Sequence, residues 1–274
     1  MIKNSVSLLL LSSIIIISSG CSSSSSESSS EPEVQWYQPE KTASFHWQLQ
    51  GSINPSYDVT IYDIDLFDTS PETIASLKAQ GKKVICYFSA GSYEGWREDA
   101  YLFHDSDLGN DLDWHDERWL DIRSENVRSI MKNRIALAAQ KGCDGVEPDN
   151  VDGYTNDPGF PLTYKDQIEY NTFLANTAHE YKLSVALKND LEQINDLVNL
   201  FDFSINEQCH HYNECDYMQP FISQGKPVFN VEYDDIYRDS QEALNALCQD
   251  SSAREFYTLV LPKALDDSFR ISCK

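Results

Sequence analysis

The sequence has little positive charge, and it lacks the motifs of several common enzyme classes. Lysine and arginine together number 21, against 44 aspartates and glutamates. Neither GxGxxG nor GxxxxGKS/T follows the first expected strand, so nothing indicates nucleotide binding. HExxH and GxSxG are also absent, and the serines near Gly91 have no histidine partner at a strand end. A zinc peptidase or a serine hydrolase is therefore not indicated.

Long apolar runs are also scarce, and the clearest one, residues 8–17, is too short to span a bilayer comfortably. Lys3 precedes this run, and small residues lead from it to Cys21, a pattern that resembles a bacterial lipoprotein signal. We predict a signal peptide over residues 1–20 and lipidation of Cys21. A plain secretory signal with an incidental cysteine is the alternative.

Residues 21–40 begin with a serine- and glutamate-rich stretch that cannot bury a core, and we interpret them as a tether. The predicted protein is exported and anchored to the bacterial cell envelope through its lipid alone. Because Ser22 rather than aspartate follows the cysteine, the outer membrane is expected if the source has one. The remaining residues, 41–274, suit one large domain, and we expect a monomer.

The charge balance bears on possible partners. Removing the predicted signal takes away only Lys3, which leaves 20 bases against 44 acids, a net charge of −24. Such a chain repels nucleic acid and anionic polymers and attracts a cationic polymer. Solubility in a salty habitat would explain the same acidity.

Six cysteines remain besides Cys21, which fits an oxidising compartment. Two disulfides are predicted, Cys209 with Cys215 and Cys248 with Cys273. Cys86 and Cys143 are harder to place, and Cys86 could be free within a buried strand. A zinc site made by Cys209, His210, His211 and Cys215 is the alternative for that segment.

Strand and helix patterns alternate after residue 40. Strand-like runs occupy residues 45–50, 59–67, 83–89, 145–148, 183–187, 201–206, 227–232 and 256–261. Helix signals separate them, such as Ser70-Pro71 at a start and Gly81 at an end. Eight strands with helical connections predict an α/β fold, a (β/α)8 TIM barrel, with an open doubly wound sheet as the alternative.

Acidic residues gather where two of these strands end. The stretch from Asp144 to Asp152 leads a short strand into a polar cluster, and Glu207 follows a later strand. Because parallel strands deliver their carboxyl ends to the same edge, we expect a pair of carboxylates there. We interpret Asp144 as a turn or capping acid and Asp121 with Arg123 as a structural ion pair. Glu147 could be a solvated or salt-bridged flank.

Six motifs in order resemble glycoside hydrolase family 114, which comprises endo-α-1,4-polygalactosaminidases and related TIM-barrel proteins. They are WQLQG at 47–51, CYFSAGSYE at 86–94, WLDIR at 119–123, GCDGVEPDNVD at 142–152, ALKN at 186–189 and NEQC at 206–209. The likeness extends from about Trp47 to Glu232. His115 stands where proline or a small residue is expected, a departure that leaves the carboxylates intact.

The resemblance implies a retaining, endo-acting hydrolase of α-1,4-linked galactosamine-rich polysaccharide that needs no metal or organic cofactor. Asp149 matches the nucleophile and Glu207 the acid/base. Glycoside cleavage needs one carboxyl group to protonate the leaving oxygen and another to meet the oxocarbenium-like carbon, with a spacing of roughly 5 to 5.5 Å for retention.

Ten further residues at the strand ends are predicted to bind substrate, although each could instead serve packing or charge balance. They are Tyr62, Asp63, Tyr87, Ser89, Glu94, Asn150, Lys188, Asn189, Glu232 and Tyr233.

Two other functions stay open. One is a non-catalytic carbohydrate-binding or envelope polysaccharide-assembly lipoprotein on the same barrel, because a fold alone does not fix activity. The other is hydrolysis of a different α-linked glycan, since specificity would depend on loops 92–118 and 153–163.

Overall fold

A computed structural model describes residues 36–112 and 114–274 of the chain. The chain divides into two units, residues 1–33 and 34–274, and the described residues all belong to the second. The predicted signal peptide, Cys21 and most of the tether lie outside them. Within the described ranges, no helix combines the length and apolar character needed to cross a membrane.

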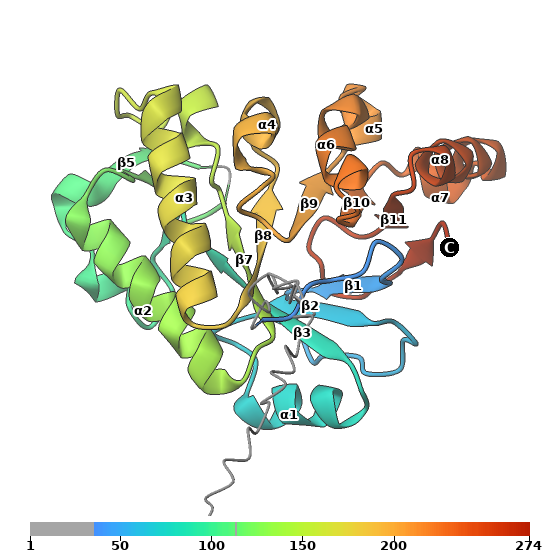
Figure 1. Cartoon of the computed structure of the whole chain (residues 1–274), viewed down its shortest axis with the longest axis horizontal. Coiled ribbons are helices and arrows are strands. Elements are labelled where there is room, and N and C mark those ends of the chain that lie inside the picture. Colours follow the sequence, from blue (N-terminus) through green and yellow to red (C-terminus); the bar gives the residue numbers. More distant parts are fainter. Residues whose placement is uncertain (1–35, 113) are drawn as a thin grey trace, which may run out of the picture. The chain divides into compact units, whose positions relative to one another are not determined.

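The second unit is built on a curled nine-stranded sheet, and each predicted strand is present in it. In spatial order the strands are β1 (Phe45–Gln48), β2 (Ile61–Asp65), β3 (Lys83–Ser89), β7 (Gly145–Asp149), β8 (Ser184–Lys188), β9 (Phe203–Glu207), β10 (Val228–Glu232), β11 (Tyr257–Val260) and β12 (Ile271–Ser272). All neighbours pair in parallel except β11 and β12. The predicted α/β barrel-like fold is confirmed (Figure 1).

Among the described residues, strand pairing does not close the sheet into a continuous barrel. In the described part of the chain, the ladder runs from β1 to β12 without pairing back to β1. A segment after β11 covers the gap, because the carbonyl of Leu265 accepts hydrogen bonds from the amides of Leu49 and Gln50. Arg270 also donates to the Phe45 carbonyl. The sheet is therefore a half-barrel sealed by a loop.

Helices cover the outside of the sheet. They are α1 (Pro71–Ala79), α2 (Glu125–Lys141), α3 (Tyr164–Glu180), α4 (Ile194–Leu197), α5 (Cys209–Tyr212), α6 (Gln219–Ser223), α7 (Ile236–Asp239) and α8 (Gln241–Ala253). Ser70, Ser124 and Thr163 accept backbone hydrogen bonds as N-caps of α1, α2 and α3. The longest two, α2 and α3, lie side by side against β7 and β8 (Figure 1). Their apolar faces are buried in the hydrophobic core.

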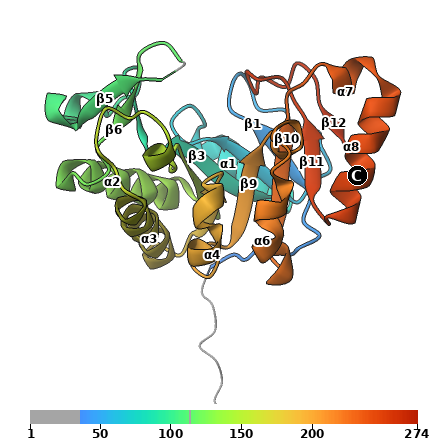
Figure 2. The ribbon, with the colours of Figure 1, turned by 90° about the horizontal axis from the view of Figure 1, so that it is seen from above.

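A second sheet was not predicted. It contains β4 (Ser92–Glu94), β5 (Leu108–Asp111) and β6 (Glu117–Leu120), paired antiparallel in the order β4-β6-β5. These strands are short and polar, and the pairing of β5 with β6 shifts register, so they carry little strand pattern. The inserted sheet joins β3 to α2 and lies at the far end of the unit from α7 and α8 (Figure 2).

Three disulfides are present in the second unit. The predicted pairs Cys209–Cys215 and Cys248–Cys273 are confirmed. The sulfurs of Cys209 and Cys215 are bonded to each other, which contradicts the zinc alternative for that segment. A free Cys86 is wrong, because it pairs with Cys143 and ties β3 to the turn before β7. Strand β3 and the turn before β7 are far apart in the sequence and become neighbours only in the folded chain.

Candidate active site

The two strand-end acids singled out in the sequence meet at a lysine that lies between them. Asp149 ends β7, Glu207 ends β9, and Lys188 ends the intervening strand β8. The Lys188 ammonium lies 2.9 Å from Asp149 Oδ1 and 3.1 Å from Glu207 Oε2. Parallel neighbours with matched register deliver all three side chains to one edge of the sheet.

Two tyrosines donate to these carboxylates. The Tyr87 hydroxyl donates to Asp149 Oδ2 at 2.9 Å, and the Tyr233 hydroxyl donates to Glu207 Oε1. Burial, reinforced by the adjacent carboxylate charges, raises the pKa of both phenols well above 10, so they remain protonated donors. Both tyrosines were predicted to bind substrate, and here they orient the acids.

Below Lys188 lie two more acids, Asp63 and Glu147, whose side chains are fully buried. Glu147 Oε1 is 3.8 Å from the Lys188 ammonium. Burial raises the pKa of both carboxyls, and their mutual repulsion adds to the rise for Glu147. Asp63 therefore has no exposed surface, and Glu147 is salt-bridged to Lys188 rather than solvated. Both acids belong to the floor that surrounds the lysine.

Three other residues predicted to bind substrate are buried and bonded to protein atoms. Tyr62 is fully buried in the core, where its hydroxyl donates to the Tyr57 carbonyl at 3.0 Å. Both carboxylate oxygens of Glu94 accept from Arg97 at 2.8 Å. Glu232 is fully buried and accepts from the His210 amide at 2.9 Å, which holds the start of α5. These polar groups stabilise the framework because their partners are protein atoms.

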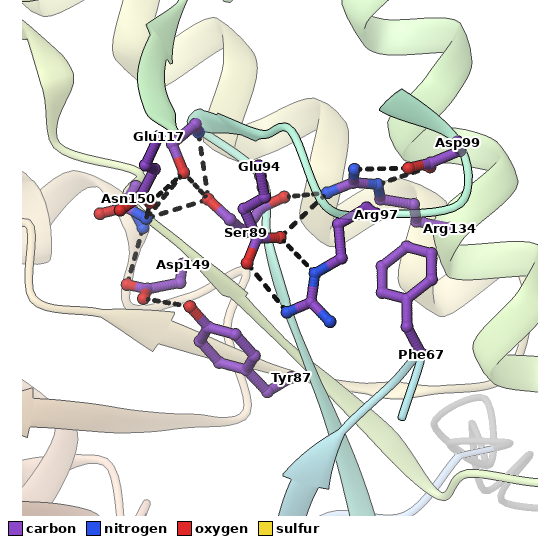
Figure 3. A network of polar contacts seen from close by, with 12 residues as sticks. Phe67, Tyr87, Ser89, Glu94, Arg97, Asp99, Glu117, Arg134, Asp149 and Asn150 are labelled. Atoms are coloured by element: carbon purple, nitrogen blue, oxygen red, sulfur yellow. Dashed lines mark hydrogen bonds and ion pairs between the residues drawn. The ribbon is translucent and has the colours of Figure 1, made fainter. Parts of the chain in front are cut away.

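The remaining predictions fall close to the acids. Asn189 borders the cleft described below, and its Oδ1 accepts from the Glu207 amide at 3.0 Å. Ser89 is buried, and its hydroxyl accepts from the Asn150 side chain at 2.9 Å. Ser89 and Asn150 thus hold the turn that follows Asp149 (Figure 3). The ion pair of Asp121 with Arg123 is confirmed, and Asp144 lies in the turn before β7, where it accepts a hydrogen bond from the Val84 amide.

A cleft of about 390 Å³ opens beside Glu207, a size suited to a small ligand. Its lining carries five acids and no base: Asp152, Thr155, Asn189, Asp190, Leu191, Glu192, Asn206, Glu207, Gln208, Tyr212, Glu214 and Tyr217. Desolvation, with the neighbouring Asp149 charge, raises the pKa of Asp152 to about 6. The cleft therefore favours a polar, positively charged ligand.

Most of these cleft residues were missed by sequence reasoning. Asp190 is the missed residue that the sequence could most easily have indicated, because it directly follows the Lys188-Asn189 motif at a strand end. Its Oδ1 is buried without a hydrogen-bond partner among the described residues, as is Asn206 Oδ1. Tyr212 and Glu214 lie within the Cys209–Cys215 loop, which the disulfide ties down beside Glu207. The predicted disulfide could have indicated that these residues lie near Glu207, because it closes a short loop directly after it.

The two loops predicted to control specificity contact each other. The amide of Asn110 in β5 donates to the Pro158 carbonyl at 3.1 Å, and its side chain donates to the Asp157 carbonyl. Thr155, at the end of the 3-10 turn η3 (Gly153–Thr155), borders the cleft. The inserted sheet is therefore connected to the cleft wall.

A barrel-like sheet that presents two close carboxylates beside a ligand-sized cleft has the arrangement of a glycoside hydrolase. The chain belongs to glycoside hydrolase family GH114, whose sequence pattern matches residues 25–274. The protein is accordingly a glycoside hydrolase.

Solved structures agree with this assignment. The structure of Aspergillus fumigatus Ega3 in complex with galactosamine is 45% identical, with a TM-score of 0.82, and the match covers 86% of this chain and 97% of that one. The glycoside hydrolase domain of PelA from Pseudomonas aeruginosa is 15% identical with a TM-score of 0.65, covering 84% and 97%, and shows likeness of fold alone. No curated protein sequence matches the chain.

Proposed function

We propose that the protein is an endo-acting hydrolase of α-1,4-linked, galactosamine-containing polysaccharide, with Asp149 as nucleophile and Glu207 as acid/base. The contact of one buried ammonium with both carboxylates carries this proposal. Asp149 Oδ1 and Glu207 Oε2 each lie within 3.1 Å of Lys188 Nζ. The two acids are thus close enough to act on one sugar ring.

The spacing supports retention of configuration. Because both oxygens contact Lys188 Nζ, they are at most about 6 Å apart, which is below the roughly 6.5 to 9.5 Å of inverting pairs. An inverting enzyme needs room for a water molecule between its general base and the anomeric carbon. A retaining enzyme needs the nucleophile to reach the anomeric carbon directly.

The surroundings of each acid support its role. Asp149 accepts from Lys188, from the Tyr87 hydroxyl and from the Asn150 amide, three donors that stabilise a carboxylate anion. Glu207 borders the cleft, and 29% of its side chain is exposed, so it can reach a leaving oxygen. A nucleophile must be ionised, whereas an acid/base must exchange protons with substrate and water.

The reaction then has two steps. Asp149 forms a bond to the anomeric carbon while Glu207 gives its proton to the departing glycosidic oxygen, and the glycosidic bond breaks. Glu207, now ionised, takes a proton from water as the water oxygen attacks the same carbon and releases Asp149. Lys188 keeps its charge throughout and offsets the repulsion when both acids are ionised.

The acidic cleft and the relative solved with galactosamine support an aminosugar substrate. At a pH where the amines of a partly deacetylated polymer are protonated, the cleft and the net charge would attract it. We also propose that the chain is lipidated at Cys21 and held at the cell envelope, which would place it near extracellular polysaccharide. The serine-rich segment supports this, since it can act as a tether.

Reducing-end release from α-1,4-galactosaminogalactan tests the proposal. Asp149→Asn and Glu207→Gln are each expected to abolish turnover, whereas Asp121→Asn, at an ion pair on a helix start, should not change it. NMR of the first product should show the α-anomer. Activity that survives both site changes would remove these residues from the mechanism, and a β-anomer as first product would exclude retention.

A further inference from the structure

We propose that Glu117, supplied by the inserted sheet, is a positioning residue for Asp149 and acts through Ser92 and Asn150. This inference rests on the proposed nucleophilic role of Asp149. Glu117 begins β6, lies far from the barrel strands in the sequence, and has only 5% of its surface exposed. Neither its position nor its sequence neighbours mark it as part of a strand-end site.

The turn after Asp149 has an uncommon backbone conformation. Asn150 adopts a positive φ of 58°, in the left-handed region that few residues other than glycine, asparagine and aspartate adopt. Its amide donates to Asp149 Oδ1 at 2.7 Å, so the conformation of the turn sets the direction of the nucleophile. A shift of this turn would change the position of the attacking carboxylate.

The loop after β3 presses against this turn. The amides of Ala90 and Gly91 donate to the Asp149 carbonyl at 2.8 and 3.0 Å. A Cβ atom at Gly91 would lie 1.6 Å from the Asn150 carbonyl oxygen, so the two backbones are in direct contact. Only glycine fits there. The main chain of the turn is thereby fixed from one side.

Glu117 fixes the Asn150 side chain from the other side. Asn150 Nδ2 lies 2.9 Å from Ser89 Oγ, 3.2 Å from Ser92 Oγ and 3.4 Å from Glu117 Oε1. The Ser92 hydroxyl donates to the same Glu117 oxygen at 2.5 Å. Figure 3 shows Glu117, Ser89 and Asn150 close to one another beside Asp149. Glu117 Oε1 therefore accepts hydrogen bonds from both the Ser92 hydroxyl and the Asn150 side chain.

The charges around Glu117 make its effect dependent on pH. Asp149 and Glu94 face it with negative charge, Arg97 with positive charge, and Ser92 and Asn150 as neutral donors. Desolvation is the main cause that raises the pKa of Glu117 to about 7. Above that pH the carboxylate accepts from both Ser92 and Asn150. Below it, the carboxyl carries a proton of its own and the arrangement of donors must change.

Glu117→Ala and Glu117→Gln separate positioning from charge. Glu117→Ala removes the acceptor, and we expect kcat to fall by about 10- to 100-fold with little change in KM, because small displacements of a reacting group have effects of this size. Glu117→Gln keeps an acceptor oxygen and should retain most activity at pH 8. Its kcat relative to wild type should rise as the pH falls from 8 to 6, because glutamine does not titrate.

Arg118→Ala is the matched control, since Arg118 is the next residue of β6 and donates instead to the Gly109 carbonyl. It should retain wild-type kcat and pH dependence. Equal losses in Arg118→Ala and Glu117→Ala would overturn the inference, as would an unchanged kcat in Glu117→Ala. If Glu117→Ala does not fold, Ser92→Ala decides, because a wild-type kcat there would contradict the proposed connection.

Asp149→Asn distinguishes this inference from the proposed function. If Asp149→Asn remains active, the assignment of the nucleophile fails. If Asp149→Asn is inactive while Glu117→Ala turns over as fast as wild type, only the positioning role of Glu117 fails.

Discussion

The Lys188 ammonium lies 2.9 Å from Asp149 Oδ1, and 2% of the lysine side chain is exposed. Glu207 and Glu147 contact the same ammonium, so one positive charge lies close to three carboxyl groups. A lysine in this position orients both proposed catalytic acids and offsets their repulsion. Its removal would leave buried negative charge without a partner.

Lys188→Met should therefore impair both catalysis and stability. We expect kcat to fall by about 10²- to 10³-fold, the size of effect seen when a buried electrostatic donor is lost. The free energy of unfolding should fall by about 3 to 5 kcal/mol. Steady-state kinetics and urea unfolding measure the two effects. Lys165→Met, at a highly exposed helix pair, is the control, and equal losses there would refute the assignment.

The disulfides should differ in what they support. Cys86–Cys143 closes a separation of 57 residues, whereas Cys209–Cys215 closes one of 6 beside the cleft. By loop entropy, removing the first should cost about 4 kcal/mol and removing the second about 2 kcal/mol. Double alanine variants, followed by thermal melting and kcat/KM, test the contrast. For each degree of melting temperature lost, the variant without Cys209–Cys215 should lose more kcat/KM than the variant without Cys86–Cys143. A larger loss of kcat/KM per degree in the Cys86–Cys143 variant would contradict this interpretation.

Asp190 should make the protein less stable at high pH. Burial, with the nearby Asp152 charge, raises its pKa to about 9. Because the folded-state value is above the unfolded one, its contribution is complete below about pH 4 and is lost as the pH rises through about 9. Asp190→Asn should flatten the fall of melting temperature between pH 5 and 9. A variant with the same slope as wild type would contradict the burial argument, and Asp121→Asn is the control.

Ionic strength should weaken binding of a cationic substrate. The cleft carries no base and four acids besides Asp190, whose pKa of about 9 keeps it neutral near pH 7, so part of the attraction for an ammonium-bearing polymer is electrostatic. Raising salt from 0.05 to 0.5 M should increase KM for deacetylated polymer by about tenfold, since the Debye length falls well below 10 Å over that range. A fully N-acetylated polymer is the control and should show little change. Equal salt dependence for both polymers would contradict charge-based recognition.

Local patterns in the sequence determined the elements of this protein. The eight barrel strands, the caps of α1, α2 and α3 and the two strand-end acids all depend on residues within a few positions of one another. Hydrophobic spacing and capping chemistry act over that range, so they can be read from the chain. Two of the disulfides were also accessible, because their cysteines are close in sequence or near the carboxyl terminus.

Only the tertiary structure decided which groups meet. The position of Lys188 between Asp149 and Glu207 depends on how the sheet curls, and the burial of Asp63 and Glu147 depends on what covers them. Glu117 reaches Asn150 because a weakly patterned inserted sheet folds back onto the barrel edge. Proximity between distant residues comes from packing of whole elements, and no local pattern in the chain carries that information.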